Sequence, residues 1–277
     1  MSAAMDERDA AVGGVAGLAP RRPMEQRRRM PGWLLALGGV AVLLVAWKLL
    51  VVVAGYPTFV LPAPEVVAAR FVRAWADGTI EPHAAATIEE IAGGLVIGVG
   101  AALPLGALLG RSRLAEQVLA PYFVAAQATP ILAVAPLIAL WFGTGLISIA
   151  AICAVVLFFP VTVATMVGVR SVDPRLVEMA AAFRATPRQR LLWVEVPAAL
   201  PAIFGGLRVG VTLAVVGAIV GEWAGANAGL GVLINLARGS LFDTPLLFAT
   251  LLTIALLGIG LYLLVVIVER RLVGVRA

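Results

Sequence analysis

Cysteine and histidine are almost absent from this sequence. Its 277 residues include one cysteine, Cys153, and one histidine, His83. A single cysteine excludes a disulfide within the chain and a metal site built from several cysteines, and a single histidine excludes a histidine cluster. We therefore expect no metal ligands in this chain.

The motifs of nucleotide hydrolysis and metal-dependent catalysis are also missing. No GxxxxGK[ST] phosphate-binding loop occurs, so the chain is not expected to hydrolyse ATP by that route. There is no HExxH motif, and no serine and acidic side chains are placed to act together with His83. These absences argue against an enzyme, and we expect neither catalytic residues nor a cofactor.

Charge is scarce as well. Charged residues make up 13% of the chain and hydrophobic residues 61%, with a mean hydropathy of +1.01. A soluble domain is about half apolar and about a quarter charged. The composition therefore predicts a polytopic membrane protein in which one integral domain fills most of the length.

The positive charge comes almost entirely from arginine, because only Lys48 among the 21 basic residues is a lysine. Sixteen of the 21 lie in the two tails, the 111–113 turn and the 170–190 loop. Nucleic-acid binding would explain a basic chain, but membrane topology explains this distribution better, since cytoplasmic loops are rich in arginine and lysine. Both termini and the 170–190 loop are therefore expected in the cytoplasm, and no nucleic-acid partner is expected.

The apolar runs divide the chain into a tail and a membrane domain. We predict a disordered basic cytoplasmic tail over residues 1–31 and a transmembrane domain over 32–277, since each long apolar run is near the 20 residues that cross a bilayer. The fold class is all-α integral membrane with six spans: Trp33–Val53, Thr87–Gly110, Leu114–Phe142, Leu146–Val169, Ala202–Val220 and Leu246–Val268. The third span is broken by Pro121, Pro130 and Pro136.

Two segments are predicted on the outer side. Pro64–Ala76 is expected to be a surface helix with Arg70 and Arg73 facing water. Residues 221–245 are expected to be a loop in which Glu222 either gates a path or is simply hydrated. Few ionisable residues fall near the centres of the predicted spans, where they would be costly.

The segment from Asp173 to Pro201 is too polar for lipid. Asp173 followed by Pro174 predicts a helix start, and Thr186 with Gln189 predicts a second start through a capping box. Two short helices are therefore expected, meeting near 184–186 and ending at Pro197 and Pro201. One face of the first helix carries only small or polar residues, which would let another surface approach closely: Glu178, Ala181, Ala182 and Ala185.

This loop resembles the EAA loop of binding-protein-dependent ABC-transporter permeases, in Glu178-Met179-Ala180 and later Val194-Glu195-Val196-Pro197. The sequence departs from the family pattern in three places, since Met179 replaces alanine, Arg184 replaces glycine and Val196 replaces leucine. An arginine forced into a left-handed conformation would cost about 1 kcal/mol. We therefore expect Thr186-Pro187 to supply the turn instead.

Three further stretches are similar to permeases of the nitrate, sulfonate and taurine uptake group. They are PTFVLPAP at 57–64, PILAVAPLIALWFG at 130–143 and GLGVLI at 229–234. Together they extend the resemblance over roughly residues 55–268. Uptake systems for thiamine-precursor pyrimidines and flavins fall in the same group, so the solute class stays open among a sulfonate, a nitrate-like anion and a thiamine-precursor-type compound.

The resemblance implies a MetI-like permease fold in a bacterial inner membrane. It also implies two ATP-binding subunits, which alone would bind ATP, an extracytoplasmic solute-binding protein and a second permease copy. The residues expected to dock the ATPase are Glu178, Ala180, Ala181, Ala182, Ala185 and Arg188. The candidates for the translocation path are Gln127, Thr129, Pro130 and Glu222.

Two other classes of function are consistent with a polytopic chain. An ion-coupled secondary carrier would need no ATPase and predicts charged residues buried within the spans. A membrane scaffold without transport would have no use for the small-residue face around Ala181. Co-purification of an ATP-hydrolysing subunit would separate the importer from both.

Overall fold

A computed structural model describes residues 32–274, so the tail predicted to be disordered lies outside the described residues. The described part is helical and contains no β-strand. The chain divides into two compact units, Met1–Trp47 and Lys48–Ala277. The helices in chain order are α1 (Gly32–Ala54), α2 (Pro64–Ala76), α3 (Glu81–Arg111), α4 (Arg113–Ala128), α5 (Ile131–Phe142), α6 (Leu146–Arg170), α7 (Pro174–Ala182), α8 (Pro187–Arg190), α9 (Val196–Trp223), α10 (Leu230–Gly239) and α11 (Thr244–Val273).

The predicted spans are confirmed, with shifted ends. Within residues 32–274, five helical segments are long and apolar enough to cross a membrane: α1, α3, α6, the run Pro187–Trp223 and α11. The remaining predicted span, the third in chain order, is the pair α4 and α5, which bends by 95°. The surface helix predicted at Pro64–Ala76 is α2, with the same ends.

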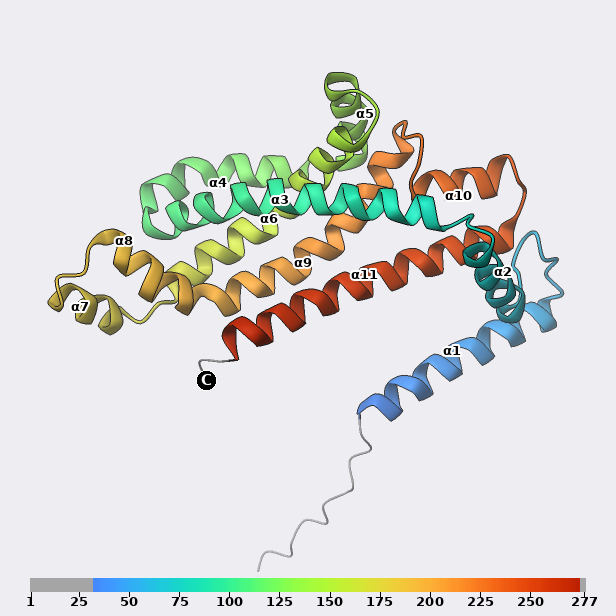
Figure 1. The fold of residues 1–277 in the computed structure, drawn as a ribbon, viewed down its shortest axis with the longest axis horizontal. Helices are drawn as coiled ribbons and strands as arrows, with labels where there is room; N and C mark the ends of the chain where they lie inside the picture. Colours follow the sequence, from blue (N-terminus) through green and yellow to red (C-terminus); the bar gives the residue numbers. More distant parts are fainter. Residues whose placement is uncertain (1–31, 275–277) are drawn as a thin grey trace, which may run out of the picture. The chain divides into compact units, whose positions relative to one another are not determined.

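Helix α6 lies between α3 and α9 in the second unit, and α11 packs on the far side of α9 (Figure 1). Small residues at four-residue intervals on α3 allow a close contact between α3 and α6. A Cβ at Gly98 would lie 2.8 Å from the Ala154 carbonyl oxygen, and one at Gly106 would lie 2.7 Å from the Thr162 carbonyl oxygen. Glycine at these positions is what lets the α3 backbone approach α6.

The same arrangement recurs where α9 meets α6. A Cβ at Gly206 would lie 2.9 Å from the Pro160 carbonyl oxygen, and Gly210 and Gly221 are also in close contact with α6 side chains. Helix α6 is the most deeply buried of the long helices, with half of its apolar window enclosed. The spans therefore assemble through backbone proximity, as expected where lipid removes the hydrophobic drive between helices.

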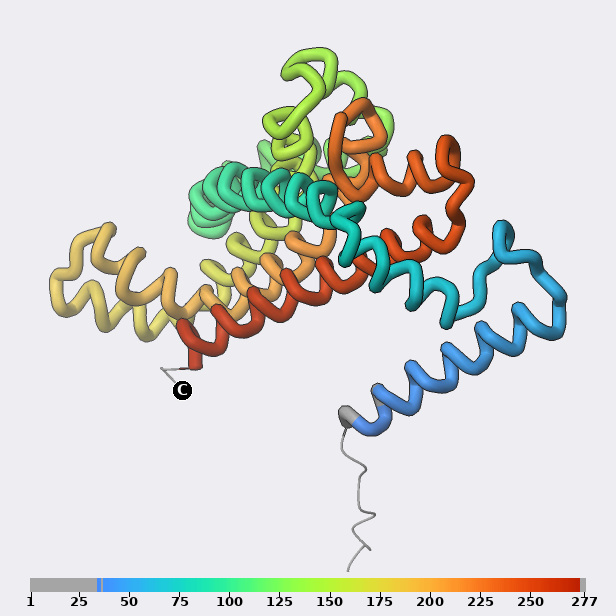
Figure 2. The backbone as a smooth tube through the Cα atoms, turned by 45° about the vertical axis from the view of Figure 1, so that its right-hand side comes forward, coloured from blue at the N-terminus to red at the C-terminus, as the bar shows by residue number. Residues whose placement is uncertain are grey.

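The break between α4 and α5 falls at Thr129-Pro130, one of the three proline positions expected to break the third span (Figure 2). Pro121 and Pro136 lie inside helices and do not end them. Thr129 has an extended backbone, which the following proline favours, and its hydroxyl donates to the Ala125 carbonyl at 3.0 Å. One of the three prolines therefore makes the turn.

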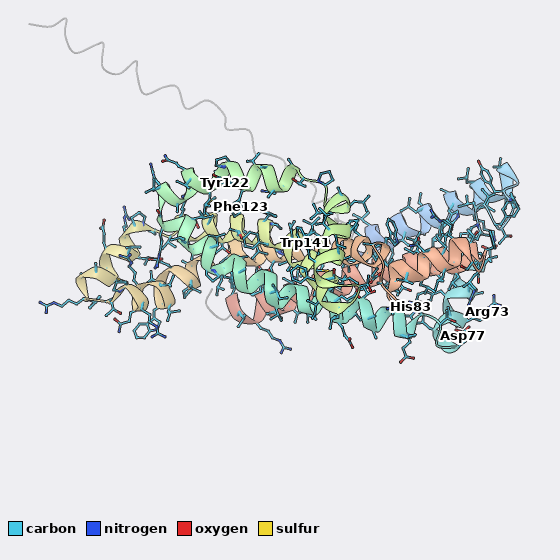
Figure 3. All side chains as sticks on the ribbon, turned by 90° about the horizontal axis from the view of Figure 1, so that it is seen from above. Arg73, Asp77, His83, Tyr122, Phe123 and Trp141 are labelled. Atoms are coloured by element: carbon cyan, nitrogen blue, oxygen red, sulfur yellow. The ribbon has the colours of Figure 1, made fainter. Side chains whose placement is uncertain are left out.

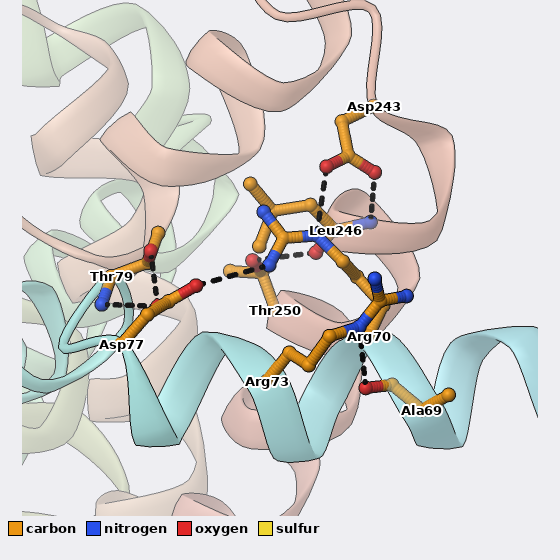
Figure 4. A network of polar contacts seen from close by, with 8 residues as sticks. All are labelled: Ala69, Arg70, Arg73, Asp77, Thr79, Asp243, Leu246 and Thr250. Carbon is orange, nitrogen blue, oxygen red and sulfur yellow. Dashed lines mark hydrogen bonds and ion pairs between the residues drawn. The ribbon is translucent and has the colours of Figure 1, made fainter.

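A polar network fixes α2 to the start of α11 (Figure 4). Asp243 caps α11 by accepting from the Leu246 N–H, and its other oxygen accepts from Arg70 Nε at 2.8 Å. Arg70 also pairs with Asp77 at 3.7 Å. The Thr79 hydroxyl and backbone N–H both donate to Asp77, which lowers the pKa of that carboxyl.

The expectation that both α2 arginines face water was therefore wrong for one of them. Arg73 is exposed at the surface of α2, whereas the Arg70 side chain is only 20% exposed and turned toward Asp243 (Figures 3 and 4). The sequence pattern of α2 could not identify the partner, because Asp243 is 173 residues away along the chain.

Candidate functional site

The polar loop forms two short helices, as predicted. Asp173 caps α7 by accepting from the Arg175 N–H at 2.9 Å. Thr186 begins α8 with the predicted capping box, since its hydroxyl accepts from the Gln189 N–H and the Gln189 side chain accepts from the Thr186 N–H. These local signals were sufficient to locate both helix starts.

The turn between α7 and α8 differs from the prediction. Arg184 itself adopts a left-handed backbone, with a φ of 53°. Its N–H donates to the Ala181 carbonyl and the Ala185 N–H donates to the Ala180 carbonyl, at 2.9 and 3.0 Å. This pair of bonds is a Schellman motif, which normally has glycine at the position of Arg184. Thr186-Pro187 starts the next helix but does not replace the left-handed residue.

The second half of the loop does not end at Pro197 or Pro201. A single π-helical turn, Leu191–Glu195, joins α8 to α9, and the Val196 N–H bonds to the Leu191 carbonyl five residues back. Pro197 then lies in the first turn of α9, where its missing N–H has little cost, and Pro201 lies inside the helix. The chain therefore runs as helix from Pro187 to Trp223.

The predicted docking residues fall on two sides of the loop. Glu178, Ala181 and Ala182 are exposed on α7, and Arg188 is exposed on α8. Ala185 is half-buried between the helices, and Ala180 is buried, so Ala180 does not contribute to the exposed surface.

An apolar stripe adjoins the exposed face of α7, and sequence reasoning missed it. Leu176, Met179 and Phe183 are 42%, 52% and 81% exposed. They are spaced three and four residues apart, so they share one side of the helix. The spacing was visible in the sequence, but burial in the protein core is the commoner explanation for such a stripe. The stripe therefore adds an apolar surface to a loop that is otherwise polar and lies outside the spans.

The α7–α8 loop is tied to α3 by a buried carboxylate. Glu195 is 5% exposed and its two oxygens are shared between two arginines. Arg111, at the end of α3, lies 2.6 Å from Glu195 Oε2, and Arg190 Nε lies 3.0 Å from Oε1. A cavity of about 330 Å³ beside this cluster is lined by Arg111, Glu178 and Glu195. The ion pair between Arg111 and Glu195 therefore attaches the loop to the end of α3.

A second region gathers three of the four path candidates. Gln127, Thr129 and Pro130 line a hollow of about 520 Å³ at the α4–α5 break. Its other walls include Phe159 and Pro160 of α6 and Val209 of α9, and it carries no charged side chain. A neighbouring hollow of about 470 Å³ shares Gln127, Pro160 and Val209.

Aromatic packing holds α4 in place beside this hollow. Phe123 of α4, labelled in Figure 3, packs on Phe158 and Phe159 of α6 at ring-centre distances of 5.9 and 5.4 Å. Trp141 on α5 is 70% exposed, so it is placed on the surface and not inside the hollow. Among the residues that line the hollow, Gln127 contributes an amide and Phe159 an aromatic ring, and the others are apolar apart from Thr129.

The fourth path candidate lies elsewhere. Glu222 belongs to α9 and not to an outer loop, and it is 2% exposed, so the expectation of a hydrated side chain was wrong. The segment predicted as a loop over 221–245 contains α10. Glu222 does not line the hollow and instead accepts hydrogen bonds from Thr87 of α3 and from the Gly231 N–H at the start of α10.

Comparison with known proteins gives one consistent family. The model for "Binding-protein-dependent transport system inner membrane component" matches residues 94–274. The riboflavin transport system permease protein of Chloroflexus aurantiacus is 45% identical, over 94% of this chain and 96% of the relative. The formylaminopyrimidine transport permease protein of Halalkalibacterium halodurans is 35% identical, over 79% of this chain and 86% of the relative.

The fold is also similar to a solved structure, that of the MetNI methionine ABC transporter in an inward-facing conformation. The TM-score is 0.58 at 19% sequence identity, covering 70% of this chain and 94% of that one. At this level of identity the similarity concerns the fold alone.

The left-handed Arg184 leads to a prediction for the α7–α8 turn. Glycine adopts this backbone without the cost that arginine incurs, so Arg184→Gly should stabilise the turn by about 1 kcal/mol. Hydrogen exchange of the Ala185 amide should then slow by roughly fivefold. Arg188→Gly is the matched control, because Arg188 is helical and its replacement should speed exchange in α8. Faster exchange at Ala185 in Arg184→Gly would show that the arginine side chain holds the turn.

The shared carboxylate leads to a second prediction. Glu195→Gln leaves two arginines without a buried partner charge, which should weaken the attachment of the loop by about 1–3 kcal/mol. Trypsin should then cleave after Arg184 and Arg188 at least several-fold faster than in the wild type. Glu178→Gln, an exposed change in the same loop, should leave the cleavage rate unchanged. Equal rates in the two variants would mean that Glu195 does not hold the loop.

Proposed function

The chain belongs to the family of binding-protein-dependent transport system inner membrane components, and from this we propose how it couples to its ATPase and what it carries. It is the permease subunit of a bacterial ABC importer and lies in the inner membrane. Its partners are an ATP-binding component and a solute-binding protein. We propose that two ATP-binding subunits and a second permease copy complete the transporter, and that ATP is hydrolysed only on the partner subunits.

In this proposal the ATPase docks on the exposed surface of α7, and Phe183 is its centre. The supporting observation is the stripe Leu176, Met179 and Phe183 beside Glu178 and Ala182, exposed on a loop too polar for lipid. An aromatic side chain that fills a partner's pocket often dominates the binding energy of an interface. Movement of the docked loop would pass through Glu195 to Arg111 and so to α3.

We further propose that the solute is a flavin or a closely similar uncharged heterocycle. Two observations support this choice over a sulfonate or nitrate-like anion. The most extensive similarity given above is to a riboflavin permease. The hollow at the α4–α5 break has no charged lining, and Arg208 on α9 is already paired with Glu269 at 3.6 Å.

A pair of equally exposed phenylalanines tests the docking surface. Phe183 and Phe242 are each 81% exposed, but Phe242 lies beside the α11 cap at the other end of the spans. Phe183→Ala should weaken binding of the purified ATP-binding subunit by at least 10-fold, since truncating a central aromatic typically costs about 2 kcal/mol. Phe242→Ala should bind as the wild type does. Equal affinities for both variants would remove α7 as the docking surface.

The solute proposal is tested by uptake into vesicles containing the permease, its ATP-binding subunits and the cognate solute-binding protein. Labelled riboflavin should accumulate on addition of ATP, and taurine should not. Gln127→Ala should lower riboflavin uptake several-fold, while Gln117→Ala, an exposed change on α4 outside the hollow, should not. ATP-driven uptake of taurine without riboflavin would overturn the proposed solute class and leave the importer function intact.

A further inference from the structure

Two carboxyl groups lie together inside the membrane domain. Glu90 of α3 is 4% exposed and Glu222 of α9 is 2% exposed, and their side chains are neighbours. Neither takes part in an ion pair among residues 32–274. The other titratable groups near the pair are His83 and Glu89 of α3 and Cys153 of α6. His83 contacts the backbone of Gly229, and among residues 32–274 it forms no ion pair with either carboxyl group.

The hydrogen bonds of the two carboxyl groups differ. Glu222 is surrounded by donors, because the Thr87 hydroxyl donates to its Oε1 at 2.6 Å and the Gly231 N–H donates to its Oε2. This is the environment of an ionised carboxylate, which accepts hydrogen bonds only. Glu90 receives no such donor, and its buried Oε2 has no hydrogen-bond partner.

Two buried carboxylates in contact would repel strongly where the dielectric is low, and sites of this kind retain a proton on one member. A protonated carboxyl becomes a donor, which suits Glu90 and not Glu222. We propose that Glu90 and Glu222 form a proton-binding site, in which Glu90 carries one proton and its O–H donates a hydrogen bond to the ionised Glu222. No residue of the α7–α8 loop or of the α4–α5 hollow belongs to this site.

Glu222 holds the turn at residues 229–231, where α10 begins, against the spans. The Leu230 N–H donates to Thr87 Oγ1 at 2.9 Å, and His83 contacts both backbone groups of Gly229. A Cβ at Gly231 would lie 2.8 Å from Glu222 Oε2, and one at Gly229 would overlap the same carboxyl. Glycine is therefore required at positions 229 and 231, because the turn lies directly on the Glu222 carboxylate. The proton on Glu90 prevents a second negative charge from forming next to that carboxylate.

Infrared spectroscopy of the full chain in lipid nanodiscs tests the proton directly. The wild type at neutral pH should show the carbonyl stretch of a protonated carboxylic acid that exchanges slowly in D₂O. Glu90→Gln should abolish this band, Glu222→Gln should retain it, and Glu89→Gln should leave it unchanged. The proposal fails if the wild type has no such band or if the band survives in Glu90→Gln, and loss of the band in Glu222→Gln alone would assign the proton to Glu222.

Thermal unfolding provides a second measurement that does not depend on the infrared assignment. Loss of the proton would place two carboxylates in contact, so the wild-type Tm should fall as the pH rises from neutral to alkaline. Glu90→Gln cannot ionise, and its amide can still donate to Glu222, so its Tm should fall less over the same range. If the Glu90→Gln chain does not fold, the wild-type profile still decides, because a Tm that stays level with rising pH contradicts a bound proton.

Discussion

The close approach of α3 and α9 to α6 is the constraint on which the other features depend. Glycines on both outer helices allow backbone contact with α6, where a methyl group would meet a carbonyl oxygen at less than 3 Å. Large apolar side chains such as Ile91, Ile149 and Leu157 then pack into the core that this close approach forms. The close approach also places Glu90, Cys153 and Glu222, from three different helices, in one buried neighbourhood.

Much of this architecture could be predicted from local signals. The number of spans followed from the lengths of the apolar runs. The start of α7 followed from Asp173 and the start of α8 from Thr186 with Gln189, because capping depends on residues close in sequence. The ends of α2 were also predicted to the residue, and its start is marked by Pro64 in the first turn, another local signal. Glycines of α3 also recur at multiples of four residues, a local pattern that indicates a close helix contact but does not identify α6 as the partner.

The remaining features could not be predicted because they depend on partners distant in sequence. Arg111 and Glu195 are 84 residues apart, and Thr87 and Glu222 are 135 apart, so only the packed helices bring them together. The turn at Arg184 was misjudged for another reason. Its left-handed backbone is disfavoured for arginine, and the Schellman bonds and the flanking helices override that preference. The docking residues and the path candidates stay predictions, although Ala180 is buried and Glu222 lies away from the hollow.

Glu195 and Glu222 lie near opposite ends of one helical run, about 40 Å apart at the usual rise per residue. Each is attached to α3, the first through Arg111 and the second through Thr87. Two fixed points on an antiparallel pair prevent one helix from sliding along the other, since a shift of one residue, about 1.5 Å, would separate both sets of partners. Rotation of α9 about its own axis is prevented in the same way. Helices α3 and α9 are therefore attached to each other at both ends, and the bend between α4 and α5 is a place where the shape can change without breaking these contacts.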